Sequence, residues 1–93
     1  MSLRTSAFEP TGRILRLEIL GRGCAQCDRL ATLAEEVARA GDRPFELVRV
    51  TALERIIAYD VVATPALVVD GTVRCIGRVP SPEELRAWFA AAR

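Results

Sequence analysis

The 93-residue chain contains neither lysine nor histidine, and all 13 of its basic residues are arginine. The missing lysine excludes Schiff-base chemistry. The missing histidine excludes imidazole general-base catalysis, Ser-His and Cys-His nucleophiles, and histidine-ligated zinc within one chain. No apolar run approaches the roughly 20 residues that a transmembrane helix needs. The chain does contain three cysteines, two of them in a close pair.

The charge balance is close to neutral. The formal net charge is +1, and basic and acidic residues are interleaved along the whole chain. Such a sequence has no basic patch for nucleic acid or anionic lipid. The hydrophobic fraction of 51% and the charged fraction of 27% are typical of a packed domain. We therefore expect a monomer with one core and with neither nucleic acid nor membrane as a partner.

Residues 1–12 differ from a secretory signal, because they contain Glu9 and Pro10 and have no apolar centre. We expect a flexible leader there, followed by one domain over residues 13–93. A close pair of cysteines suits redox or metal chemistry in a reducing compartment better than a secreted disulfide framework. The sequence therefore predicts a cytoplasmic protein.

The first half of the domain predicts a strand followed by a helix. Residues 14–20 alternate, with Leu15, Leu17 and Ile19 on one apolar face. A Gly-Arg-Gly segment breaks this strand, and apolar residues recur at helical spacing from Cys27 onward. Cys24 is thereby placed at the N-terminus of a helix.

The second half predicts two more helices and three strands. Residues 45–50 alternate as a strand, and Thr51 with Glu54 forms the pattern of a capping box before a short helix. Residues 66–76 predict a hairpin with Asp70-Gly71 as its turn, which would pair Cys75 with Ala66. A final helix follows a second capping pattern, Ser81-Pro82-Glu83-Glu84.

The resulting order is β-α-β-α-β-β-α. A helical crossover between the first two strands implies parallel pairing, and the hairpin implies antiparallel pairing.

The spacing of Cys24 and Cys27 has a chemical consequence. Unpaired N–H groups and the positive end of the helix dipole stabilise an anion, so a thiol at a helix N-terminus ionises more readily than a free one at about pKa 8.5. A thiolate attacks disulfides, and a second sulfur one turn later is close enough to resolve the mixed disulfide. The pattern predicts Cys24 as the nucleophile and Cys27 as the resolving thiol.

The sequence resembles the thioredoxin superfamily, and within it the small, glutaredoxin-sized redox-active disulfide proteins. The resemblance runs from Ile14 onward and rests on three matches: Gly21-Arg22-Gly23-Cys24-Ala25-Gln26-Cys27, Thr64-Pro65-Ala66, and Gly77 with Val79-Pro80-Ser81. It implies a thioredoxin-like α/β fold, in which a central four-stranded mixed sheet has helices on both faces.

The resemblance also implies an activity and a substrate edge. In such proteins the proline matching Pro65 is cis and lies beside the cysteines, and the backbone of the residue matching Thr64 pairs with the bound substrate chain. The expected activity is thiol-disulfide exchange without cofactor or metal. The expected partners are a disulfide-containing protein or small-thiol substrate, and a reductase or thiol donor.

Some features depart from the best-known members of that superfamily. No tryptophan precedes Cys24, no Gly-Pro separates the cysteines, and no glutathione-binding Gly-Gly lies near the last helix. The redox potential and the reductant therefore stay open. Two other functions stay open as well. One is a module that holds a soft ion such as Cu(I) between the two thiolates, although such modules have the order β-α-β-β-α-β. The other is a thioredoxin-like interaction domain without turnover.

Three further residues have alternative interpretations. Glu18 lies six residues before Cys24, where thioredoxins carry a buried acid, but it shares a strand face with Arg16. We expect a paired or solvated carboxylate there, not a proton relay. We expect Cys75 to be packed and unreactive, and Arg22 to be exposed.

Overall fold

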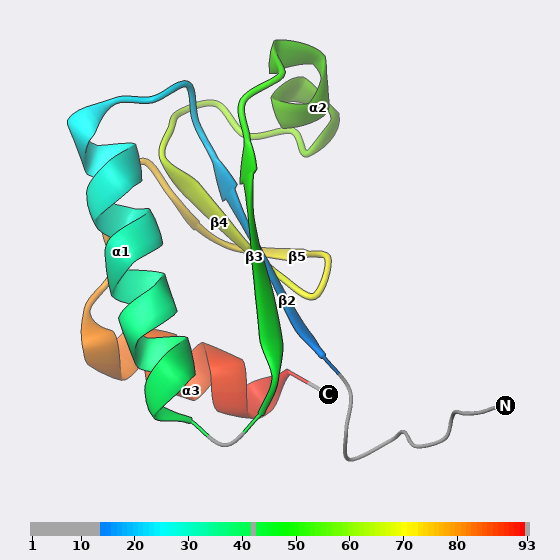
Figure 1. Ribbon diagram of the computed structural model, residues 1–93. Helices are drawn as coiled ribbons and strands as arrows, with labels where there is room; N and C mark the ends of the chain where they lie inside the picture. Colours follow the sequence, from blue (N-terminus) through cyan, green and yellow to red (C-terminus); the bar gives the residue numbers. More distant parts are fainter. Residues whose placement is uncertain (1–13, 42, 93) are drawn as a thin grey trace, which may run out of the picture.

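The computed structural model describes residues 14–41 and 43–92, so the predicted leader over residues 1–12 lies outside the described part. The elements follow the predicted order (Figure 1). They are β2 (Leu15–Leu20), α1 (Ala25–Ala40), β3 (Phe45–Val50), α2 (Leu53–Ala58), β4 (Ala66–Val69), β5 (Thr72–Ile76) and α3 (Pro82–Ala91).

The four strands form one mixed sheet in the order β3-β2-β4-β5. Strands β2 and β3 are parallel, since α1 carries the chain back across the sheet between them. Strand β4 is antiparallel to both β2 and β5. The predicted mixed sheet is confirmed. The carboxyl ends of β2 and β3 lie at the same edge, so the loop before α1 and the helix α2 both start there.

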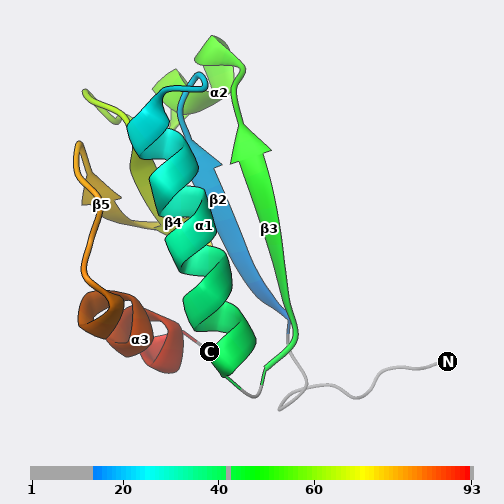
Figure 2. The ribbon, with the colours of Figure 1, turned by 60° about the vertical axis from the view of Figure 1, so that its left-hand side comes forward.

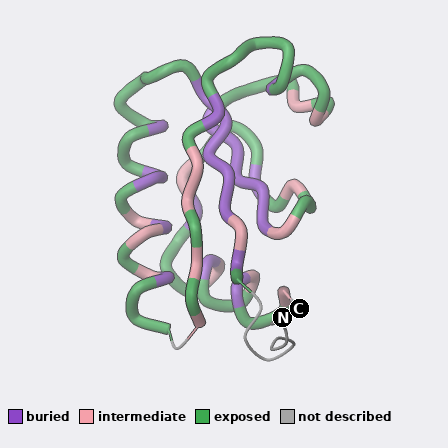
Figure 3. The backbone as a smooth tube through the Cα atoms, turned by 45° about the vertical axis from the view of Figure 1, so that its right-hand side comes forward, coloured by how far each residue is buried: buried purple, intermediate pink, exposed green. Residues whose placement is uncertain are grey.

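Helices α1 and α3 cover one face of the sheet (Figures 1 and 2). Their apolar sides pack on the sheet residues that point to this face, and burial is concentrated in the central strands and on the inward side of α1 (Figure 3). We call this cluster the α1/α3 core. Its fully buried leucines are Leu17, Leu30, Leu67 and Leu85.

Helix α2 covers part of the opposite face, at the end where β3 finishes (Figure 1). A smaller cluster, the α2 core, contains Leu20, Val50, Ile56, Ala66 and Val68. Helices on both faces are thus confirmed. Over residues 14–41 and 43–92, none of the helices combines the length and apolar character needed to cross a bilayer.

The hairpin has the predicted turn but a different register. Asp70 and Gly71 both have positive φ, 49° and 86°, as a two-residue hairpin turn requires. A β-bulge follows on β5, so Cys75 pairs with Leu67 and the predicted pairing with Ala66 is wrong. One extra residue opposite the partner strand turns the following side chain to the other face. Cys75 therefore joins the α1/α3 core.

The helix starts also differ from prediction in one case. Helix α2 begins at Leu53 with Ala52 as its N-cap and without a side-chain capping bond, so the capping box predicted at Thr51 is wrong. The helix starts one residue too late for Thr51 to reach its first turn. Burial of Ile56 in the α2 core holds α2 in place of a cap.

Helix α3 has its predicted capping box. The Ser81 hydroxyl accepts from the Glu84 N–H at 3.1 Å, and the Glu84 carboxylate accepts from the Ser81 N–H at 2.9 Å. Behind this cap, Leu85 and Phe89 are buried against the sheet and α1, while Trp88 is half-buried at the edge of the same core.

Candidate functional site

The candidate site begins where β2 ends. Gly23 has a φ of 87°, a left-handed conformation that suits glycine, and it turns the chain into α1. Cys24 is the N-cap of α1, with φ −78° and ψ 166°, and its sulfur accepts a hydrogen bond from the Cys27 N–H at 3.3 Å. The Cys24 side chain thus takes the place that a serine or aspartate usually takes at a helix start.

The two cysteines differ in exposure. Cys24 is exposed, whereas Cys27 is completely buried beneath it. Their sulfurs are 2.9 Å apart and share a hydrogen bond. A disulfide arriving from solvent therefore meets Cys24 first, and Cys27 is within reach of any sulfur bound to Cys24.

The electrostatics of the pair follow the same asymmetry. The pKa of the Cys24 thiol lies below its ordinary value, because the Cys27 thiol and then backbone N–H groups of the first helical turn donate to its sulfur. Burial and the bond to Cys24 raise the pKa of Cys27. The lowered pKa therefore belongs to the exposed sulfur, and the raised pKa belongs to the buried one.

Gly21 is a site residue whose steric role the sequence analysis did not identify. It is buried, and a methyl group added to it would overlap the Cys27 sulfur. The same methyl would lie 3.7 Å from the Cβ of Thr64, and the Gly21 N–H donates to the Val50 carbonyl at 3.0 Å. A glycine three residues before a Cys-x-x-Cys pair was the available signal.

The structure brings the Thr64–Pro65 segment to the same place. The peptide bond between Thr64 and Pro65 is cis. Thr64 is exposed and next to Gly21, while Pro65 is fully buried. The Pro65 carbonyl accepts from the Gly77 N–H at 2.7 Å, which joins this segment to the end of β5. The segment thus lies at the edge of the sheet where Cys24 begins α1.

Glu18 is buried, with 4% of its surface exposed, and both of its oxygens are paired. The Tyr59 hydroxyl donates to one at 2.9 Å, and the Arg16 Nε donates to the other at 3.2 Å. Arg16 also binds Glu46 on β3 at 2.7 Å. Burial, followed by the bond to Glu18, raises the pKa of Tyr59. The expectation of a paired carboxylate is confirmed, and its tyrosine partner was not foreseen.

The third cysteine has the predicted structural character. Cys75 is 4% exposed within the α1/α3 core, and its thiol donates to the Arg78 carbonyl at 3.4 Å. Burial raises the pKa of this thiol, which disfavours the reactive thiolate. Arg22 is exposed, as expected.

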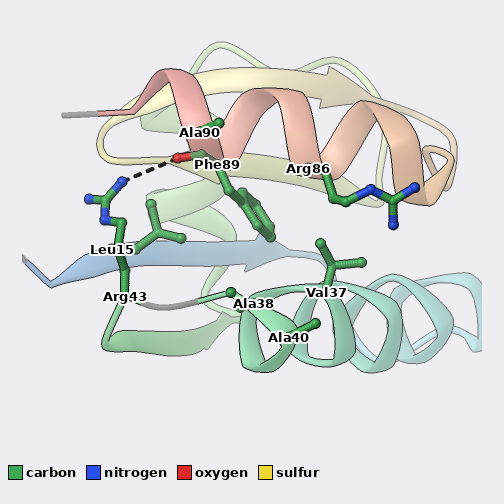
Figure 4. Close-up of a pocket in the computed structure, with 9 residues that line it drawn as sticks. Leu15, Val37, Ala38, Ala40, Arg43, Arg86, Phe89 and Ala90 are labelled. Carbon is green, nitrogen blue, oxygen red and sulfur yellow. Dashed lines mark hydrogen bonds between the residues drawn. The ribbon is translucent and has the colours of Figure 1, made fainter.

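An apolar pocket of about 450 Å³ lies at the other end of α1 (Figure 4). Val37 and Phe89 line it from the facing helices. Arg43, at one side, donates from Nη1 to the carbonyls of Phe89 at 3.2 Å and Ala92 at 2.7 Å, which ties the end of α3 to the α1–β3 loop. Neither cysteine of the pair lines this pocket.

A metal ion would find few side-chain ligands at the pair. Among the described residues, no three cysteine, aspartate, glutamate or histidine side chains gather around one point. Cys24 and Cys27 could supply two sulfurs and no more, a ligand set that fits a two-coordinate soft ion.

The fold and the site define a thioredoxin-like α/β protein with a dithiol at the start of its first helix. Residues 15–90 match the family model of the thioredoxin domain. The chain is also 32% identical, over 73 residues, to a thioredoxin from Methanothermobacter thermautotrophicus, an overlap that covers 78% of this chain and 95% of that protein. The chain therefore belongs to the thioredoxin family.

Proposed function

We propose that this protein is a thiol-disulfide oxidoreductase that reduces disulfides through Cys24 and Cys27. The asymmetry of the pair supports the proposal most directly. One sulfur is exposed and has a lowered pKa, and the other is buried 2.9 Å away with a raised pKa. A nucleophile needs access and charge, whereas a resolving thiol needs proximity and protection from other disulfides.

The proposed reaction has two exchange steps. The Cys24 thiolate attacks one sulfur of the substrate disulfide, that bond breaks, and the released substrate thiolate takes up a proton. Cys27 then loses its proton and attacks the Cys24 sulfur, which releases the second substrate thiol. The substrate gains two electrons and two protons, and the protein ends with a Cys24–Cys27 disulfide. A reductase or thiol donor returns the protein to the dithiol.

The proposed docking edge for substrate is Thr64 with Pro65. Thr64 is exposed and lies near the cysteines, separated from the Cys27 sulfur by Gly21. An extended segment of substrate could pair with the Thr64 backbone as a short added strand. We propose a disulfide-containing protein as substrate, a monomeric enzyme, and a reducing compartment such as the cytoplasm, since reduction needs a continuous supply of thiols.

Single cysteine variants test the two roles. In a Cys75→Ala background, Cys24→Ser should abolish disulfide reduction, because no accessible thiolate is left. Cys27→Ser should accumulate a mixed disulfide with substrate, because attack continues and resolution is lost. Mass spectrometry of the trapped species identifies the attacking sulfur. A mixed disulfide trapped on Cys27, or equal activity of both variants, would contradict the assignment.

A redox titration separates this function from the two alternatives. The exchanger predicts one two-electron transition shared by Cys24 and Cys27, read by thiol alkylation. A soft-metal module predicts a bound ion after purification and no such transition. An interaction domain without turnover predicts a dithiol that titrates but does not reduce a protein disulfide such as insulin in the presence of dithiothreitol.

A further inference from the structure

The bond between Tyr59 and Glu18 joins two parts of the molecule that lead to the site. Tyr59 is the C-cap of α2 and stands directly before the segment 60–64, which leads to Pro65. Glu18 lies on β2, three residues before Gly21. The Tyr59 hydroxyl bonds the Glu18 carboxylate at 2.9 Å across 41 residues of sequence.

Most of the segment 60–64 has little packing of its own; the exception is Val61, which is half-buried against the α2 core. It belongs to no helix or strand, and Val62 is 94% exposed, with Ala63 and Thr64 exposed beside it. Its position therefore depends on how its two ends are held. At the Pro65 end, the Gly77 N–H binds the Pro65 carbonyl and β4 pairs with β2.

At the other end, Val61 and Tyr59 both pack on the α2 core, and the Tyr59 hydroxyl also reaches Glu18. The acceptor is itself fixed, because Arg16 binds the second Glu18 oxygen and also binds Glu46 on the neighbouring strand. A hydrogen bond to a buried, doubly held carboxylate is more directional than apolar contact alone.

We propose that the Tyr59–Glu18 hydrogen bond positions the substrate-docking edge at Thr64 and so favours protein disulfides over small ones. The inference rests on the proposed function. A protein substrate must pair with the Thr64 backbone while its sulfur reaches Cys24. The distance between Thr64 and Cys24 must therefore match the distance between the docked segment of the substrate and its disulfide. A small disulfide needs Cys24 alone.

The contact is separate from the reactivity of the nucleophile. Tyr59 and Glu18 lie on the α2 side of the sheet, whereas α1, whose N-cap is Cys24, packs on the other side. The groups that lower the pKa of Cys24 are Cys27 and backbone N–H groups of the first turn of α1. Loss of the contact should therefore change docking and leave the chemistry of Cys24 unchanged.

The decisive variant is Tyr59→Phe, which removes one hydroxyl and keeps the ring. With insulin as substrate and dithiothreitol as electron donor, KM should rise by about fivefold, the effect of one lost hydrogen bond, with kcat little changed. With hydroxyethyl disulfide as substrate, kcat/KM should stay at the parent value. The pH midpoint for alkylation of Cys24 should not move.

Three controls separate positioning from a general loss of packing. Ile56→Val truncates the same α2 core without touching the hydrogen bond, and it should leave the KM for insulin unchanged. In a Glu18→Leu background the bond is already absent, so Tyr59→Phe should add no further increase. Glu18→Gln retains an acceptor for the Tyr59 hydroxyl, so its KM for insulin should stay close to the parent value.

An unchanged KM for insulin in Tyr59→Phe would overturn the inference, as would an equal loss toward insulin and hydroxyethyl disulfide or an equal effect of Ile56→Val. In each of these cases an inactive Cys24→Ser variant would show that the exchange function itself stands. Activity that survives in Cys24→Ser would overturn the proposed function, and the inference with it.

Discussion

Gly21 and Cys27 are so close that the Cys27 sulfur occupies the space that a Gly21 side chain would need. Gly21 is the residue that follows β2, and Cys27 is the buried member of the dithiol. The Cys27 sulfur is thus held against bare backbone at the end of β2. Any side chain at this position would have to displace the sulfur or shift the backbone.

Gly21→Ala should therefore destabilise the reduced protein by about 1–3 kcal/mol, as overpacking of a close-packed site does. Gly21 is outside the left-handed region, so alanine meets a steric conflict and no backbone strain. Urea unfolding measures the change. In a Cys27→Ala background the sulfur is absent, and the cost of Gly21→Ala should become much smaller. Equal costs in the two backgrounds would show that the sulfur is not the obstacle.

The reactivity of Cys24 should depend on its partner. In Cys75→Ala, the rate of alkylation by iodoacetamide should rise with pH around a midpoint below that of an ordinary thiol, because the Cys27 thiol and backbone N–H groups stabilise the thiolate. Adding Cys27→Ala removes the largest of these contributions and should move the midpoint upward. A midpoint that stays in place would mean that the helix N-terminus alone sets the pKa.

Cys75→Ala should lower the free energy of unfolding by about 1 kcal/mol, the effect of a small core truncation, because its side chain is buried in the α1/α3 core. The redox potential of the Cys24–Cys27 pair should stay nearly unchanged. Urea unfolding and a redox titration against glutathione check the two statements. A large shift in potential without loss of stability would make Cys75 a third redox partner.

Stability should fall in acid through Glu84. Arg78, and then the Ser81 N–H, hold the pKa of this carboxyl at about 2, below an ordinary value of 4.5. A pKa lowered by folding stabilises the protein above the unfolded value, and that contribution is lost as pH falls from about 4.5 toward 2. The effect should be small, because the pair is half-exposed and screened by solvent.

Urea unfolding at roughly pH 6 and pH 3 measures this loss, because these two pH values lie above and below the ordinary pKa of a glutamate. Glu84→Gln should reduce the difference between them. Glu83→Gln leaves the Arg78–Glu84 pair intact and should keep the difference at the parent size. If Glu84→Gln left the acid dependence unaltered, the pair would have no measurable role in stability.

The order of elements was predictable because its signals are local. Alternating and helical periodicities, the Asp70-Gly71 turn and the capping box at Ser81 each depend on neighbours along the chain. The same is true of Cys24 at the N-terminus of a helix, since the Gly21-Arg22-Gly23 segment breaks the strand before it. These predictions are confirmed.

The register of Cys75 was not predictable from the turn. Counting from Asp70-Gly71 assumes that each residue of one strand meets one residue of the next. The bulge breaks this count, leaves Arg74 exposed and brings Cys75 inward. The bulge depends on what the side chains on each face of the strand pack against. The hairpin sequence alone shows only that one strand lies beside the other.

The sequence by itself determined the β-α-β-α-β-β-α order and the placement of Cys24 and Cys27 at a helix start, because turns, caps and periodicity act over a few residues. Only the tertiary structure decided that Gly21 lies against the Cys27 sulfur and that Glu18 is buried with Tyr59 as its partner. Close packing and the burial of a charge depend on atoms that arrive from distant parts of the chain, and a linear pattern does not specify their meeting.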